Sequence, residues 1–271
     1  MSLAPSKKPP SAKPSFDLDY SVHDFEVSPH RDNQFLTRRT EELMLREAST
    51  KGGRTLDVAC GVGRLVKQLR ARGTESCGLE PSPEMCGVSR WLFPREQVVL
   101  VRGIAEALPF RDGSLDRITC QGSLDHFVDP QAFMREVARV LRPDGRAIIA
   151  LANYESLSCR LGWLIERLTQ ALLRRPRPSH RPYWQPPPDH YHKGGLSFIR
   201  QLGGRELRLE RCYGASLLWL LPGWGNSLDR LPRFLADALL TALDTIAYRV
   251  PAVADMIVSV WQPRRKSDAG S

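Results

Sequence analysis

Two glycines and two carboxylates near residue 60 have the types and spacing of a ligand site. Gly61 and Gly63 follow a short apolar strand and precede an amphipathic helix, in the stretch RTLDVACGVGRL at 54–65. A strand that enters a helix through glycines brings backbone N–H groups close to whatever lies at its carboxyl end. Asp57 lies within that strand, and Glu80 ends a second apolar strand. A carboxylate at this place accepts two hydrogen bonds from a ribose diol, so the stretch predicts a nucleoside site.

The glycine loop argues against a dinucleotide site. A G-x-G-x-x-G fingerprint has its third glycine three positions beyond the second, where this chain has Val66. Hydride transfer with a nicotinamide cofactor is therefore a secondary alternative. The cysteines include no C-x-x-C pair, and His190 and His192 have no third ligand at suitable spacing beyond Asp189. The sequence therefore predicts no metal site.

Alternating apolar strands and amphipathic helices follow the glycine loop. Ser82 and Asp129 each place a capping oxygen before a proline that can open a helix. Strands that alternate with helices of this length imply parallel pairing through right-handed crossovers. We predict strands near 54–60, 75–80, 97–102, 115–120 and 145–152, and helices near 63–72, 83–91 and 130–141.

Four blocks resemble the class I S-adenosylmethionine (SAM) dependent methyltransferases, and among them the branch of ubiquinone and menaquinone methyltransferases (methyltransferase type 11). They are LDVACGVGRL at 56–65, GLEPSPEM at 78–85, GIAEALPFRDGSLDRI at 103–118 and RVLRPDGRAIIA at 139–150, in the family's order and spacing. Within the first block, Ala59 and Cys60 stand where the family tends to place glycine and another small residue. The resemblance implies a Rossmann-like α/β fold: a seven-stranded, mostly parallel sheet with an antiparallel last strand, helices on both faces and helical insertions on the acceptor side.

The resemblance also implies SAM as the cofactor and assigns residues to it. The two glycines would line the methionine moiety, with Asp57 near its amino group, and Glu80 would hold the ribose hydroxyls. A block at 104–106 would meet the adenine edge, and Arg39, on a helix predicted over 20–48, would lie against the cofactor together with Tyr20. The implied cofactor-binding residues are Asp57, Ala59, Gly61, Gly63, Glu80, Pro81, Ile104, Ala105, Glu106 and Gln121.

Three histidines are the candidates for a general base. His126 follows the fourth predicted strand, in the loop that faces the acceptor, and a histidine changes its charge near neutral pH. His190 and His192 lie in PDHYHKGG, where the resembling branch commonly has a substrate-facing histidine. A structural role is the competing interpretation for each of the three.

The half of the chain beyond residue 152 departs from a minimal methyltransferase. It predicts an amphipathic helix over about 157–172, an irregular Pro-rich lid, a short helix over 196–203, a strand at 206–213, a helix over 229–250 and a closing strand at 255–263. The apolar stretch GASLLWLLPGWGNSL before the last helix is expected to be core, with a substrate wall or a membrane-surface patch as the alternatives. We therefore predict one domain over 18–271, with insertions at about 153–195 and 214–250.

Composition limits the remaining possibilities. The chain has 271 residues, 42% of them hydrophobic, and a formal charge of +9. Residues 1–17 are rich in Pro, Ser and Lys and predict a disordered tail. Six scattered cysteines and the lack of a signal or membrane-spanning segment are typical of a cytoplasmic protein. Much of the basic excess lies in the tails and one loop, so no specific nucleic-acid partner is expected.

These observations predict a SAM-dependent methyltransferase for a small, apolar or aromatic acceptor. Oxygen is the simplest acceptor atom, and carbon or nitrogen fit the same core. A nucleic-acid methyltransferase gains support from the basic charge, yet QGSL replaces the Asn-Pro-Pro-Tyr type of motif after the fourth strand. The sequence also leaves open a nicotinamide-dependent oxidoreductase and a non-catalytic SAM-binding protein. It does not determine the acceptor, the oligomeric state or the pathway.

Overall fold

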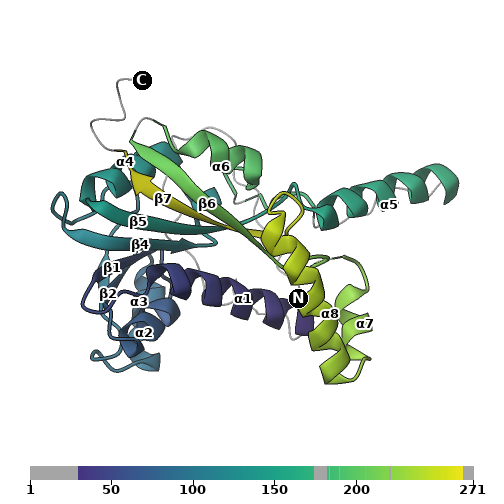
Figure 1. Cartoon of the computed structure of the whole chain (residues 1–271), viewed down its shortest axis with the longest axis horizontal. Coiled ribbons are helices and arrows are strands. Elements are labelled where there is room, and N and C mark those ends of the chain that lie inside the picture. Colours follow the sequence, from purple (N-terminus) through teal and green to yellow (C-terminus); the bar gives the residue numbers. More distant parts are fainter. Residues whose placement is uncertain are drawn as a thin grey trace, which may run out of the picture.

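The central element is a seven-stranded sheet with strand order β3-β2-β1-β4-β5-β7-β6 (Figure 1). The computed structural model describes residues 30–173, 182, 184–188, 190–204, 206–219 and 221–264, so the predicted tail at 1–17 lies outside the described residues. The strands are β1 (Arg54–Val58), β2 (Glu75–Glu80), β3 (Leu100–Arg102), β4 (Leu115–Gln121), β5 (Leu141–Ala152), β6 (Leu207–Ala215) and β7 (Met256–Pro263).

Pairing within the sheet confirms the predicted fold class. Strands β1 to β5 run parallel, whereas β7 is antiparallel to both neighbours and lies between β5 and β6. The helices are α1 (Arg31–Ala48), α2 (Arg64–Ala71), α3 (Pro83–Leu92), α4 (Pro130–Val140), α5 (Leu157–Leu173), α6 (Leu196–Leu202), α7 (Trp224–Asp229) and α8 (Arg233–Arg249), with a 3-10 turn at Leu124–His126. Parallel pairing brings the carboxyl ends of β1, β2 and β4 to one edge of the sheet.

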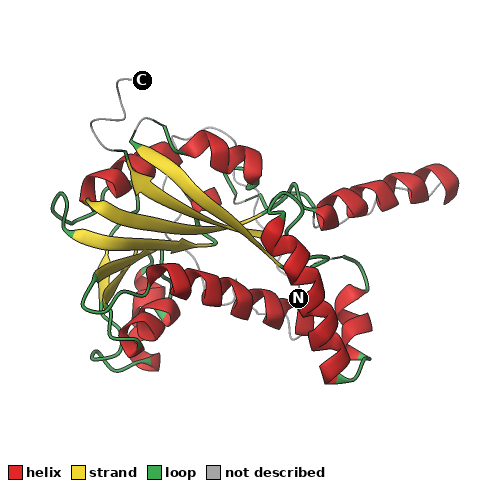
Figure 2. Cartoon of the chain, viewed as in Figure 1, coloured by secondary structure: helices red, strands yellow, loops and turns green. Residues whose placement is uncertain are grey.

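Helices cover both faces of the sheet (Figure 2). One face packs α4 and α6 on a core that includes Phe133 and Ile199, and the other packs α1 and α2 through Leu43 and Leu69. The predicted caps are in place, because Ser82 Oγ accepts from Met85 N–H and Asp129 Oδ1 accepts from Ala132 N–H. Local sequence and tertiary packing therefore agree over this half of the chain.

Three predicted elements differ from the structure in their bounds. The strand expected at 97–102 begins only at Leu100, because the N–H groups of Gln97 and Val98 turn back to the carbonyl of Pro94. The strand expected at 145–152 begins earlier, at Leu141. The helix expected at 229–250 is α8, which begins only after Pro232; the short helix α7 before it was not predicted.

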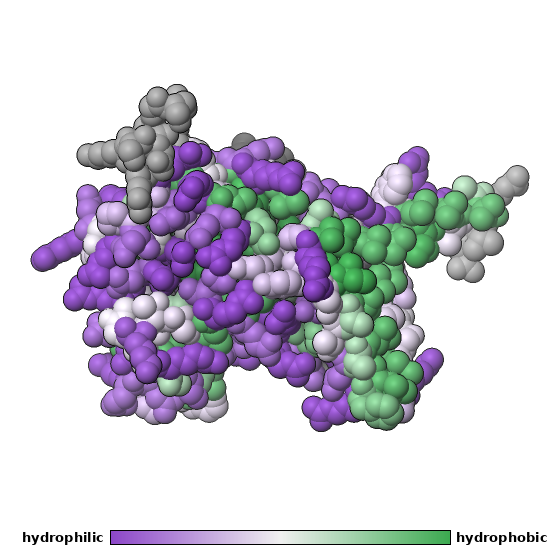
Figure 3. Space-filling model, in the orientation of Figure 1, coloured by the Kyte–Doolittle hydropathy of each residue, from purple (hydrophilic) through white to green (hydrophobic). Residues whose placement is uncertain are grey.

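The surface divides into a polar part and an apolar part. Hydrophilic side chains cover much of the sheet side, whereas hydrophobic ones gather over α5 and α8 (Figure 3). Within the described ranges, no helix combines the length and the apolar character needed to cross a bilayer. The apolar part of this surface therefore belongs to helices too short or too polar to span one.

Gly78, in the middle of β2, is a test of this packing. A Cβ there would clash with Cys60 Sγ and lie 2.7 Å from Leu100 Cδ2. We expect Gly78→Ala to reduce the free energy of unfolding by about 1–3 kcal/mol, because the strand and the glycine loop must separate. Urea denaturation measures the change. Gly87→Ala is the matched control: a Cβ at that helical position meets no atom within 4 Å, so the variant should be as stable as wild type or more so. Equal losses in both variants would contradict the packing.

Candidate functional site

The loop after β1 is held open by residues in left-handed conformations. Ala59, Gly61 and Gly63 have φ angles of 52°, 55° and 84°. A Cβ on Gly61 would meet no atom within 4 Å, so the backbone of this loop faces open space. A Cβ on Gly63 would instead collide with Val98, which shows why this position needs glycine. The loop thus presents bare backbone at the carboxyl edge of the sheet.

Glu80 links the loop after β1 to the loop after β2. Its carboxylate accepts hydrogen bonds from Gly61 N–H at 2.8 Å and from Ser82 N–H at 2.9 Å. Burial raises the pKa of Glu80, and the two backbone donors oppose the rise. Two N–H donors leave further lone pairs on a carboxylate, so Glu80 is able to accept hydrogen bonds from a ligand as well.

Asp57 is a buried carboxyl group behind the glycine loop. It is 3% exposed, and Thr119 Oγ1 donates to it at 2.7 Å from the adjacent strand β4. Burial raises its pKa to about 7; the Thr119 hydroxyl opposes the shift and the charge on Glu80 adds to it. A buried acid with so high a pKa favours either a proton or a positively charged ligand nearby.

The remaining predicted cofactor residues lie around the same edge or connect it to its neighbours. Gln121 ends β4, and Pro81 directly follows Glu80. The Glu106 carboxylate accepts from Val128 N–H at 3.1 Å and so ties the 103–110 loop to the loop before α4. Ala105, beside Ile104, is buried in the core. The adenine role of this block stays a prediction, and its observed role is to join two loops.

An acid and two histidines meet beyond the carboxyl end of β4. His190 Nδ1 lies 2.7 Å from Asp125 Oδ2, and the rings of His126 and His190 are 4.2 Å apart between centroids. Tyr154, just after β5, approaches His190 edge-on at 6.0 Å. The backbone N–H of Tyr191 bonds the carbonyl of Asp125 at 2.9 Å and fixes this meeting. The Nδ1 and Oδ2 atoms are close, but His190 Nδ1 does not meet the angular requirement of a hydrogen bond. A buried carboxylate beside a histidine is an arrangement that can serve a general base.

The same three side chains also have metal-ligand types. The ligand atoms of Asp125, His126 and His190 lie within 4.8 Å of one another. The sequence prediction of no metal site considered only neighbours of His190 and did not include Asp125 and His126, which lie more than sixty positions away. Acid–base work and metal binding both suit these residues, and His126 and His190 are the two predicted catalytic residues that the fold brings together.

His192 is separate from this cluster. Its Nε2 lies 3.1 Å from the carbonyl oxygen of Phe127, and its ring stacks on Phe198 at 5.4 Å. These contacts fix the loop against α6 and the 3-10 turn. The catalytic role of His192 stays a prediction that its surroundings do not favour.

A buried polar group at the end of β5 was not predicted from the sequence. Asp255 is 3% exposed and accepts from the Ser158 hydroxyl and from Trp219 N–H. Burial raises its pKa to about 7, and these donors oppose the rise. Asn153 Nδ2 donates to the carbonyl of Ala254 at 2.7 Å. These contacts join the beginning of the 153–195 insertion to the end of the 214–250 insertion. The sequence gives no local signal for them, because Asn153 and Asp255 lie about a hundred residues apart.

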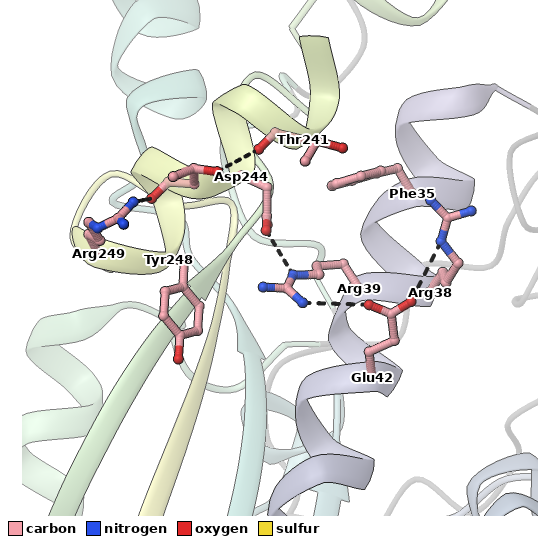
Figure 4. A pocket seen from close by; sticks show the side chains of 9 residues that line it. Phe35, Arg38, Arg39, Glu42, Thr241, Asp244, Tyr248 and Arg249 are labelled. Carbon is pink, nitrogen blue, oxygen red and sulfur yellow. Dashed lines mark hydrogen bonds and ion pairs between the residues drawn. The ribbon is translucent and has the colours of Figure 1, made fainter. Parts of the chain in front are cut away.

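A pocket of about 400 Å³ lies between α1 and α8 (Figure 4). Arg39, predicted as a cofactor contact, bonds Asp244 at 2.7 Å and lies 3.5 Å from Glu42, while Tyr248 and Phe35 form apolar walls. The pocket shares no lining residue with the glycine loop. The Arg39–Asp244 ion pair joins α1 to α8, whereas Glu42 pairs with Arg38 and Arg39 within α1. Tyr20 lies outside the described residues.

Comparison with known proteins adds family information to this geometry. Residues 56–149 match the model of a family described as "Methyltransferase domain". An uncharacterized methyltransferase of Mycobacterium tuberculosis (Rv3342) is 39% identical over 113 residues, which cover 42% of this chain and 44% of the relative. A ubiquinone biosynthesis O-methyltransferase of Xanthomonas oryzae is 31% identical over 105 residues, 38% of this chain and 44% of the relative. The chain thus matches less than half of the length of these relatives.

The fold is also similar to that of solved structures. The YcgJ protein of Bacillus subtilis superposes with a TM-score of 0.52 at 20% identity, covering 84% of this chain and 99% of that one. At this identity the likeness concerns the fold alone. The superposition covers 84% of this chain and so extends beyond residues 56–149, which shows that the two proteins share the overall arrangement of the fold.

The pKa of Asp57 predicts how stability depends on pH. Because its folded value of about 7 exceeds its ordinary value of 3.8, the folded state binds the proton more tightly, and stability is lost as pH rises from about 4 to about 7. Asp57→Asn removes this titration, and we expect its loss of stability over that range to be smaller than that of wild type by more than about 1 kcal/mol. Urea denaturation across the pH range measures this. The control, Asp144→Asn at an exposed position, should follow wild type; an Asp57→Asn profile identical to wild type would contradict the assignment.

Proposed function

From the SAM-dependent methyltransferase domain that this chain carries at residues 56–149, we infer that the protein transfers a methyl group from SAM to the oxygen of a small apolar or aromatic acceptor. The observation that carries the proposal is the position of the Asp125–His190 pair beyond the carboxyl end of β4. In parallel α/β sheets, ligands bind outside the carboxyl ends of the strands. A cofactor loop and an acid–base pair are then neighbours on one edge of the sheet.

The residues of the edge fit SAM. The open space over Gly61 leaves room for a ligand against the backbone. The carboxylate of Glu80 has lone pairs left to accept hydrogen bonds from a ribose diol. The pKa of Asp57 is raised because its charge is buried, and a nearby ammonium group would stabilise that charge. When bound, SAM supplies a methyl group on a positively charged sulfur. We propose Gly61 and Gly63 beside its methionine part, Asp57 near its amino group and Glu80 at its ribose.

His190 is the proposed general base. Its Nδ1 lies 2.7 Å from the carboxylate of Asp125, which is 2% exposed, so we propose that the other ring nitrogen is the one that meets an acceptor hydroxyl. Removing the hydroxyl proton as the oxygen attacks makes the oxygen a better nucleophile, and such a base contributes a factor of about 10²–10⁴ in rate. Alignment of acceptor and methyl group contributes the larger share.

Aromatic neighbours support an apolar or aromatic acceptor. Tyr154 and His126 surround His190 with ring edges, and Tyr154 comes from the same insertion as His190 itself. A relative named as a ubiquinone biosynthesis O-methyltransferase, 31% identical over 105 residues, supports oxygen over nitrogen and carbon as the acceptor atom. Ring edges carry partial positive charge and favour the face of an electron-rich ring.

The function is tested with labelled SAM and a panel of phenols, catechols, aromatic amines and short oligonucleotides. Release of S-adenosylhomocysteine together with a methyl ether product is the expected result. Methylation of the amines or of the oligonucleotides alone would overturn the oxygen proposal. Tight SAM binding with no turnover on any of these acceptors would favour a non-catalytic binding protein.

Glu80 provides a test of cofactor binding. Glu80→Gln keeps the shape of the side chain and removes the charge that accepts from backbone and ribose, so we expect the Kd for SAM to rise about 10–100-fold. Calorimetric titration measures it. Glu75→Gln, at the exposed opposite end of the same strand, is the matched control and should bind as wild type does. Unchanged affinity in Glu80→Gln would refute the proposed ribose site.

His190 provides a test of the chemistry. We expect His190→Gln to lower kcat about 100-fold or more while the Kd for SAM stays within about twofold of wild type. The acid limb of the pH–rate profile should disappear with it, which a purely structural role would not produce. His192→Gln is the control and should change kcat by less than about tenfold. Similar losses in both variants would assign His190 to the structure of the loop instead.

A further inference from the structure

Helix α5 carries an apolar stripe that no described element covers. Leu164, Ile165, Leu168 and Leu172 are 44–78% exposed. At 100° per residue these four positions fall within one side of the helix, and Leu157 and Leu161 continue the same line toward its start. The helix projects away from the sheet (Figures 1 and 2). Burial within the described fold therefore does not explain this stripe.

Helix α8 carries a second stripe of the same kind. Its buried side packs through Ala236, Leu240 and Ala247, whereas another side exposes a line of apolar residues. Counted at four, seven or eight residues apart, the exposed line falls on one side of the helix. It comprises Leu231, just before α8, then Leu235, Leu239 and Ile246, and Val250 just after it.

The two stripes begin from one place. Leu157, at the start of α5, packs with Leu243 of α8 and with Val253 in a small cluster, and its N–H bonds the carbonyl of Val253 at 3.0 Å. The space-filling view shows hydrophobic atoms running from α5 across this junction onto α8 (Figure 3). A single extended apolar surface results, which we name the α5–α8 surface; it consists of Leu164, Ile165, Leu168, Leu172, Leu235, Leu239 and Ile246.

Arginines outnumber acids around the α5–α8 surface. Arg160 and Arg167 lie on α5, Arg230 lies just before α8, and Arg233 and Arg249 lie at the two ends of α8. The nearby acids are Glu166 on α5, which accepts a hydrogen bond from Gln170, Asp229, which is paired with His30, and Asp237, which lies 3.9 Å from Arg233. An apolar stripe beside arginines matches an anionic lipid headgroup layer above acyl chains.

We propose that the α5–α8 surface docks the protein on the surface of an anionic lipid bilayer, with the apolar stripes in the acyl boundary and the arginines at the headgroups. A second copy of the chain is less favoured, because two such surfaces face to face would bring the arginines of α5 and α8 together. The apolar stretch at 214–228, which the sequence suggested as a membrane patch, is not part of this surface. Trp219 in that stretch bonds Asn33 and Asp255.

Vesicle co-sedimentation of the full chain tests the proposal. The vesicles are phosphatidylglycerol with phosphatidylcholine in equal parts, and phosphatidylcholine alone. We expect wild type to partition onto the anionic vesicles, more weakly onto the neutral ones, and less as salt is added. The double variant Leu164→Gln/Leu168→Gln should lower the partition coefficient at least about tenfold, because the variant loses the favourable transfer of two leucine side chains from water into the bilayer. Leu235→Gln/Leu239→Gln should act likewise.

The control is Gln170→Ala, on the opposite side of α5 from Leu168, which should bind vesicles as wild type does. Both double variants change exposed residues, and unchanged circular dichroism verifies that they fold. Absence of wild type from the anionic vesicle pellet overturns the proposal, as does undiminished binding by the double variants. A dimer in sedimentation velocity that the double variants dissolve, with no binding to lipid, assigns the surface to a second copy instead. The readout is binding to lipid, so it is independent of the proposed methyl transfer.

Discussion

The carboxylate of Glu80 is the contact on which the edge of the sheet with the glycine loop depends. It reaches from the end of β2 to the N–H groups of Gly61 and Ser82 and so fixes two crossover loops against each other. The loops hold their shape only with residues that tolerate positive φ, and the parallel register of β1 with β2 brings Val58 opposite Leu79, one residue before Glu80. A shift of that register would move the carboxylate to the other face of the sheet. Strand pairing and loop geometry therefore support one another here.

Buried acids recur along the same edge of the sheet. Asp57 and Asp255 are both nearly inaccessible, and burial raises the pKa of each to about 7. Each is stabilised by hydroxyl or backbone donors, without a cationic partner in the contacts described above. Their roles differ: Asp57 lies behind an open glycine loop and suits a cationic ligand, whereas Asp255 joins the roots of two insertions. Burial thus raises the pKa of both acids, but Asp57 suits a ligand site whereas Asp255 stabilises the fold.

The insertions after β5 and β6 give the fold its individual character. They supply His190 to the acceptor side, and they add α5 and α8 with their exposed apolar stripes. An apolar acceptor and a lipid surface are chemically related, because a molecule that partitions into a bilayer is concentrated there. The Rossmann-like core carries the glycine loop and Glu80, and the added helices carry the exposed apolar stripes.

The sequence by itself determined the α/β core, the glycine loop and the acids Asp57 and Glu80. These features depend on local patterns, in which strand, turn and cap lie within a few residues of one another. The late start of α8 after Pro232 was also readable from the sequence, whereas the short helix α7 was not predicted. Only the tertiary structure decided that His190 meets Asp125, that Glu106 bonds the loop before α4, and that α5 is left uncovered. These depend on contacts between segments far apart in the chain, and an amphipathic pattern does not state whether its apolar side will find a partner.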